Sequence, residues 1–284
     1  MSTAIALQDG ITTQQLMEAT GQKSAYNEVI PQLSVNYKSE DDQKQEIPRG
    51  AFVLRNKDGV PFFFKKASIQ ICFATYNYSH YDRKAKKQVA TSVQESSMGG
   101  EFPDSAGGFK CGKVTGKAKE GLSPEQKETN NKIKAGRIVY GLLTATGKDA
   151  AGVEHTVENY PVRVFGRGAN YMPPEEYLKS LGEKGVFMGA VETSLSLTRK
   201  VGDDDGEFWV INWENAGVAK VTGTDMFNTI KQFGEIVKAE NVKIMEKHIA
   251  AVNGGAVDST ATDDGVAIDD CINDEIPFGE AAQS

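Results

Sequence analysis

Hydrophobic and polar residues alternate over several short stretches of this chain, as in β-strands that bury one face. Leu33, Val35 and Tyr37 begin the pattern, and an Asp-Gly pair at 58–59 marks a hairpin turn soon afterwards. Seven or so short strands are typical of a β-barrel or a β-sandwich. We expect strand-rich segments near 51–54, 60–81, 88–94, 138–144, 157–165, 187–197 and 208–213.

A helical period replaces the alternation near the end of the β region. Apolar residues from about 225 to about 250 fall near one stripe, as they do on a helix that packs against a core. This helix is expected to cover an open end or face of the sheet, although it could also bind a partner. A shorter helix is expected at 174–181, where Pro and Glu suit a first turn.

Three other segments lack the pattern of a packed core. Residues 1–30 are polar with weak periodicity and are expected to form an N-terminal arm. Residues 96–136 are rich in Gly and Lys and are expected to form a long functional insertion. Residues 254–284 are acidic and poor in large apolar side chains, so a disordered tail is expected. The predicted β domain therefore spans 31–253.

Charge is distributed unevenly along the chain. The net charge is −7, yet residues 258–284 carry eight acidic residues and no Lys or Arg, which leaves the rest at about +1. Residues 65–148 hold fifteen basic and seven acidic residues. A region with this surplus suits a polyanion, although solvated basic loops would give the same count.

Aromatic and basic residues are interleaved from Phe62 onward, a pattern suited to unpaired nucleic-acid bases that stack on rings beside cations. If the strand through 69–78 is regular, Tyr76 and Tyr78 lie opposite Ile69 and Ile71 and face solvent. They could instead extend a second hydrophobic layer. Residues 62–64 cannot all face one side, so at least one of the three phenylalanines belongs to the core.

Two further segments add candidate contacts to phosphates. Residues 107–113 form a basic glycine loop, and Arg163 and Arg167 share one face of a later strand. The candidate residues for binding single-stranded DNA are Phe62, Phe64, Lys65, Lys66, Tyr76, Tyr78, Tyr81, Arg83, Lys84, Lys86, Lys87, Phe109, Lys110, Lys113, Lys117, Arg137, Arg163 and Arg167.

Catalytic and metal motifs are weak. Residues 107–113 fit the first seven places of a phosphate-binding loop, but Val114 stands where a hydroxyl must hold magnesium. The three histidines are scattered and the three cysteines have no metal-site or disulfide spacing. We expect no enzyme activity and no cofactor. With neither a secretory leader nor a membrane helix in the pattern, a cytoplasmic protein is expected.

The segment Asp274-Glu275-Ile276-Pro277-Phe278 resembles the acidic tip of single-stranded DNA-binding proteins of bacteria and their phages. The resemblance covers little more than ten residues, and six residues follow Phe278 here where the family usually ends. It implies a phage-type protein with an oligonucleotide-binding (OB) fold-like antiparallel β-barrel. Such a protein is located in the host cytoplasm. The resemblance also implies a tail that recruits replication or repair proteins, with Phe278 as the anchor and the acids as electrostatic guides.

Three hypotheses follow from the sequence. The first is a protein that coats single-stranded DNA in replication, recombination and repair, as a possible homo-oligomer. The second is a β-rich structural or assembly protein that uses the tail as an interaction peptide. The third is a nucleotide-dependent enzyme that uses the glycine loop.

Overall fold

The computed structural model describes residues 30–254, apart from 42–43, 57, 83–84, 86 and 203–205. The chain divides into two units, Met1–Ile30 and Pro31–Ser284, and the fold below is that of the second unit. Nearly all of the expected N-terminal arm (1–30) and of the expected acidic tail (254–284) lie outside the described residues.

The described part of the second unit is mainly β. Its strands join one nine-stranded sheet, and three α-helices and four short 3-10 turns (η1–η4) accompany them. The strands are β1 Gln32–Asn36, β2 Ala51–Arg55, β3 Pro61–Phe64, β4 Lys66–Asp82, β5 Lys87–Thr91, β6 Ile133–Lys148, β7 Glu154–Gly166, β8 Val191–Val201 and β9 Glu207–Val218. The helices are α2 Pro124–Lys132, α3 Met172–Glu183 and α4 Gly223–Val252.

Five of the described strands close into a barrel in the order β3-β2-β1-β7-β6, because β3 also pairs with β6 at Phe63 and Lys148. Closure brings the two backbones very close. A Cβ at Gly147 would lie 2.2 Å from the carbonyl oxygen of Phe63, so only glycine fits there. The expected OB-like barrel is confirmed, with the difference that β1 and β7 pair in parallel.

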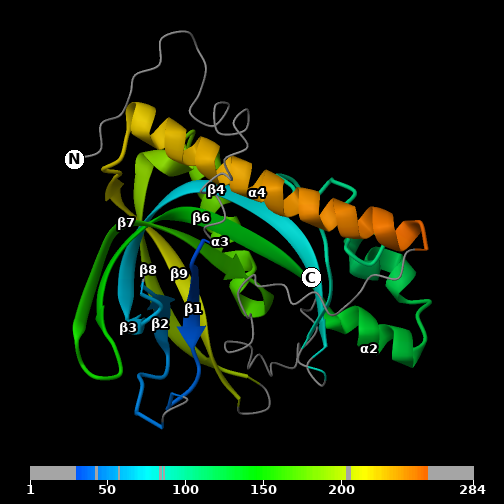
Figure 1. Cartoon of the computed structure of the whole chain (residues 1–284), viewed down its shortest axis with the longest axis horizontal. Helices are drawn as coiled ribbons and strands as arrows, with labels where there is room; N and C mark the ends of the chain where they lie inside the picture. Colours follow the sequence, from blue (N-terminus) through cyan, green and yellow to red (C-terminus); the bar gives the residue numbers. More distant parts are fainter. Residues whose placement is uncertain are drawn as a thin grey trace. The chain divides into compact units, whose positions relative to one another are not determined.

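The long strand β4 extends the sheet beyond the barrel. It pairs with β6 along most of its length, with β8 near its start and with β5 near its end. The far ends of β4 and β6, with β5 and the connection that carries η1, η2 and α2, project away from the barrel (Figure 1). We call this part, residues 76–137, the arm.

A β-bulge in β4 decides which side chains face the core. Ile71 pairs with Gly141 and Phe73 with Tyr140, the next residue back on β6, so Cys72 is an extra residue in β4. The faces exchange at this point: Ile71 lies in the main core, but Phe73 turns towards Tyr140, with ring centroids 6.2 Å apart. The sequence alone gives no sign of this exchange.

Two helices cover the sheet. The expected C-terminal helix is present as α4, which lies along β4 and β6 in Figure 1 and packs Phe233 on Tyr140, with centroids 5.6 Å apart. The expected short helix is present as α3, whose Tyr177 and Leu181 are buried in the main core. No helix in the described part of the chain combines the length and apolarity needed to cross a membrane.

Candidate nucleic-acid interface

The phenylalanines expected as stacking platforms belong to the barrel core. Phe62 and Phe64 are 0% and 5% exposed, and their ring centroids lie 5.5 Å apart. Phe63, between them, is also buried, in a small separate cluster. The expectation that Phe62 and Phe64 bind bases is therefore wrong, because both rings are enclosed by the closed barrel.

Tyr76 and Tyr78 are buried as well, which corrects the expectation of an exposed stacking face. The bulge at Cys72 reverses the alternation assumed for a regular strand. Both tyrosines form a second apolar cluster with Phe102 and Ile133, and the Tyr78 and Phe102 rings meet edge to face at 5.1 Å. The alternative of a second hydrophobic layer is the one that the structure bears out.

Arg137 is buried against Tyr76 rather than free to contact phosphate. Its guanidinium carbon lies 3.9 Å from the ring centroid of Tyr76, and its Nε lies 3.3 Å from a carboxylate oxygen of Glu175. The Tyr76 hydroxyl donates to the same carboxylate at 2.8 Å. Burial, followed by this hydrogen bond, raises the pKa of Tyr76 to about 12. The three groups join α3 to the base of the arm.

Arg163 and Arg167 share a face, as the sequence predicted, but Arg163 is held in an ion pair. Arg163 is buried and pairs with Glu240 of α4 at 3.0 Å, so it fastens the helix to β7. Both guanidinium carbons lie over the ring of Phe165, at 5.3 Å for Arg163 and 4.8 Å for Arg167. Phe165 is only partly buried, and the apolar–basic alternation of this strand does not distinguish a partly open ring from a core residue.

The glycine loop at 107–113 is held by a carboxylate of the chain itself. Asp104, 1% exposed, accepts hydrogen bonds from the backbone N–H groups of Ala106, Gly108 and Cys111, at 3.0, 3.1 and 2.8 Å. A phosphate-binding loop keeps such amides for its ligand. Here the carboxylate occupies them, so this geometry gives no support to the nucleotide-hydrolysis hypothesis.

Lys113 also turns inward. Its ammonium donates to the carbonyl oxygens of Asn130 and Ile133, at 2.6 and 2.7 Å, where α2 passes into β6. Burial, with the nearby charges of Lys134 and Lys119, lowers the pKa of Lys113 to about 8. The expectation that Lys113 contacts DNA is therefore corrected: its ammonium caps the end of a helix.

The part of the loop that remains open combines a ring with lysines. Phe109 is 53% exposed and meets the edge of His248 at 5.8 Å. The ammonium of Lys110 lies 5.8 Å from the ring centroid of Phe102, while Lys117 and Lys119 of η2 (Gly116–Lys119) are exposed. We call Phe109, Lys110, Lys117 and Lys119 the loop surface.

The other described candidates lie on other elements than the loop surface. Lys65 and Lys66 are exposed at the opposite end of β4, and Tyr81 and Lys87 lie at the tip of the arm. Arg83, Lys84 and Lys86 lie outside the described residues, as do the tail residues Asp274, Glu275, Ile276, Pro277 and Phe278.

The described residues contain no candidate metal site, because no group of three His, Cys, Asp or Glu side chains converges among them. Comparison with protein-family models, curated proteins and solved structures gives no match. The fold therefore defines the class: a mainly β protein with a closed five-stranded OB-like barrel and a long C-terminal helix.

Proposed function

We propose that this protein binds single-stranded DNA without catalysis. The observation that carries the proposal is the loop surface, where the ring of Phe109 and the side chains of Lys117 and Lys119 are exposed on one connection between β5 and β6. Binding of unpaired strands needs this combination, since rings stack on bases at about 1–3 kcal/mol each and ammonium groups follow the phosphates. An OB-like barrel is a common carrier of such surfaces.

The preference for single strands follows from the geometry of stacking. A protruding ring reaches a base face only where that base is unstacked, and in a duplex the base faces are covered by their neighbours. Lysines alone would bind both forms through their phosphates. Phe109 therefore supplies the discrimination and the lysines most of the affinity.

In this role the protein coats and protects unpaired DNA during replication, recombination and repair in the cytoplasm of a phage-infected host. The segment from Asp274 to Phe278 recruits partner proteins of those pathways. Support for this part comes from the sequence resemblance and from the opposite charges of the tail and the middle of the chain.

The test is a fluorescence-anisotropy titration of labelled oligo-dT and of a duplex of equal length. Phe109→Ala should weaken oligo-dT binding about tenfold and leave the weak duplex binding nearly unchanged, because stacking alone is lost. The double variant Lys117→Glu/Lys119→Glu should weaken both. Lys220→Glu, an exposed lysine between β9 and α4, is the matched charge control. Equal affinity of the wild type for both forms of DNA would contradict the proposal.

The second candidate function, assembly of a β-rich structural particle, is favoured by one observation on α4. An open apolar groove of about 460 Å³ lies on this helix, lined by Val237, Val242, Met245 and Ile249 among others. Exposed apolar grooves of this kind mark interaction surfaces. Light scattering of the protein without DNA tests this function. If it is correct, large assemblies form in the absence of any nucleic acid.

A further inference from the structure

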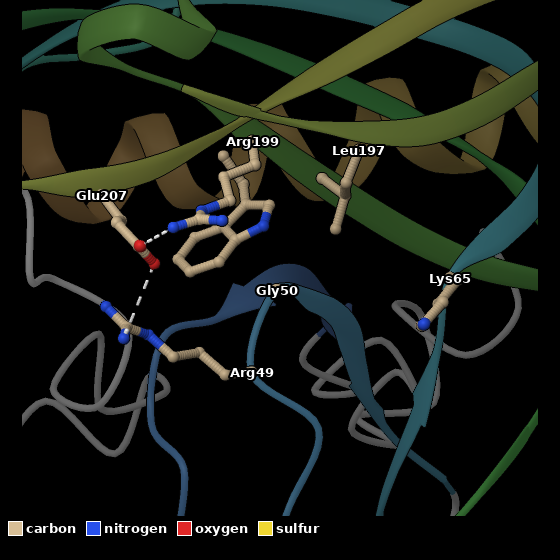
Figure 2. Close-up of a pocket in the computed structure, with 7 residues that line it drawn as sticks. Arg49, Gly50, Lys65, Leu197, Arg199 and Glu207 are labelled. Carbon is tan, nitrogen blue, oxygen red and sulfur yellow. Dashed lines mark hydrogen bonds and ion pairs between the residues drawn. The ribbon is translucent and has the colours of Figure 1, made fainter. Parts of the chain in front are cut away.

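A second basic site lies at the start of β4, far from the loop surface. Figure 2 shows a pocket of about 530 Å³ between the start of β2, the β3–β4 junction and the β8–β9 hairpin. Side chains from separate segments meet there, so the sequence pattern gives no sign of it. The lining includes Arg49, Lys65, Leu197, Arg199, Glu207 and Trp209.

The charges of this pocket leave a positive surplus. Glu207 accepts a hydrogen bond from Arg199, and its other oxygen lies 3.8 Å from Arg49, while Lys65 points into the same space (Figure 2). The side chains of Arg49 and Arg199 are 49% and 60% exposed, so their pairing with Glu207 contributes little stability. Both guanidinium groups are therefore available to bind a phosphate. Each can form two parallel hydrogen bonds to phosphate oxygens, whereas the two groups share a single carboxylate here.

A rigid aromatic wall backs these cations. Trp209 is 8% exposed, with the guanidinium carbon of Arg49 5.2 Å and the ring centroid of Tyr37 5.5 Å from its own ring centroid. Gly50 permits this close packing, since a Cβ there would lie 2.2 Å from the indole nitrogen. Cations beside Leu197 and an indole suit a nucleotide, which has both an anionic and a flat apolar part.

We propose that this pocket holds one nucleotide of a bound DNA strand, with its phosphate between Arg49 and Arg199 and its base against Leu197. The inference rests on the proposed function and extends it, because it adds a contact at the opposite end of β4. Residues 66 and 78 of that strand lie roughly 40 Å apart along its backbone at 3.3 Å per residue. A strand long enough to reach both sites gains affinity from the second contact, and a short one does not.

The experiment uses the full-length chain with Trp213→Phe, which leaves Trp209 as its one tryptophan. Tryptophan emission and anisotropy are followed while oligo-dT of about 4 or about 16 nucleotides is added, the span of site sizes known for OB folds. Arg49→Gln/Arg199→Gln is the test variant, and Lys179→Gln, 73% exposed on α3, is the control. Circular dichroism confirms that each variant is folded.

The longer oligonucleotide should change Trp209 emission and bind at least tenfold tighter than the shorter one. The double arginine variant should lose the emission change and about tenfold in affinity for the longer strand, and Lys179→Gln neither. If the arginine variant bound oligo-dT of both lengths with wild-type affinity and Trp209 emission stayed constant, the assignment of the pocket would be overturned. The proposed function would still stand. Absence of any oligo-dT binding would overturn the function itself.

A further titration distinguishes binding of DNA in the pocket from binding of the chain's own acidic segment. A synthetic peptide of residues 269–280 is titrated into the same protein. A response of Trp209 to this peptide and not to oligo-dT would overturn the nucleotide assignment. A response to oligo-dT that the peptide does not reproduce supports it.

Discussion

Single residues in the arm show how a basic pattern in a sequence can serve the fold. Arg137 and Tyr76 look like DNA contacts when only their types and spacing are known. In the structure they stack on each other and share the carboxylate of Glu175. Their neighbours across the sheet and on α3 decide this, and a single sequence does not reveal those neighbours.

The role of Tyr76 can be tested by a double-mutant cycle with its carboxylate partner. Tyr76→Phe and Glu175→Gln should each lower the free energy of unfolding by about 1 kcal/mol, because each weakens a half-buried hydrogen bond. Their effects should be coupled by about 0.5–1.5 kcal/mol. Urea denaturation of the four proteins measures this, and oligo-dT affinity should stay within about twofold. A large loss of affinity in Tyr76→Phe would show that this ring contacts DNA after all.

Lys113 makes a pH prediction whose sign follows from burial. Its pKa is lowered to about 8 in the folded protein from an ordinary 10.5, so the unfolded chain binds more protons between these values. The cost of burying the charged ammonium is fully present below pH 8 and is relieved as the pH rises towards 10.5. Relative to Lys113→Met, the wild type should gain stability from pH 7.5 to 9.5 in urea denaturation. A constant difference between the two proteins would contradict the lowered pKa.

At the scale of elements, the alternation of residues predicted the β class, a helical period predicted the long final helix, and Pro and Glu in a first turn predicted the short helix before β8. The alternation could not predict the bulge at Cys72, because the residues before and after the extra residue each keep their own alternation of faces. Nor could it predict that β3 returns to β6, since closure depends on a contact between residues 63 and 148. The barrel was inferred from strand number and resemblance, and its closure is a tertiary property.

Closure can be probed at Gly147, where β3 approaches β6 most closely. Gly147→Ala should lower the free energy of unfolding by about 1–3 kcal/mol, because its methyl group would overlap the Phe63 carbonyl. Gly182→Ala in α3 meets no atom within 4 Å and should raise stability by up to about 1 kcal/mol. Thermal denaturation of the two variants compares them directly. Equal melting temperatures would show that β3 and β6 are not held this tightly.

For the whole molecule, the sequence located a basic region at 65–148 but did not show which cations of the chain remain accessible. Arg137, Arg163 and Lys113 are paired with groups of the fold, whereas Arg49 and Arg199, outside the predicted set, line an open pocket. Charge counts are additive along a chain, but accessibility is decided by packing.

The opposite charges of residues 65–148 and residues 258–284 lead to a prediction for the acidic segment. Removal of residues 258–284 deletes eight acidic residues, which we expect to compete with phosphates for the basic region. The truncated protein should bind oligo-dT more tightly, and the gain should shrink as salt is added. Anisotropy titrations at low and high salt measure both effects. Weaker binding after truncation would rule out competition.

The most direct test of the central claim is the titration of the full-length protein with oligo-dT and with duplex DNA at two salt concentrations. About four phosphate contacts would lower the affinity for oligo-dT roughly 50-fold between about 50 and 200 mM salt. The proposal predicts saturable binding, this dependence on salt and a clear preference for the single strand. Equal binding of both forms of DNA, or no saturable binding to either, would contradict it.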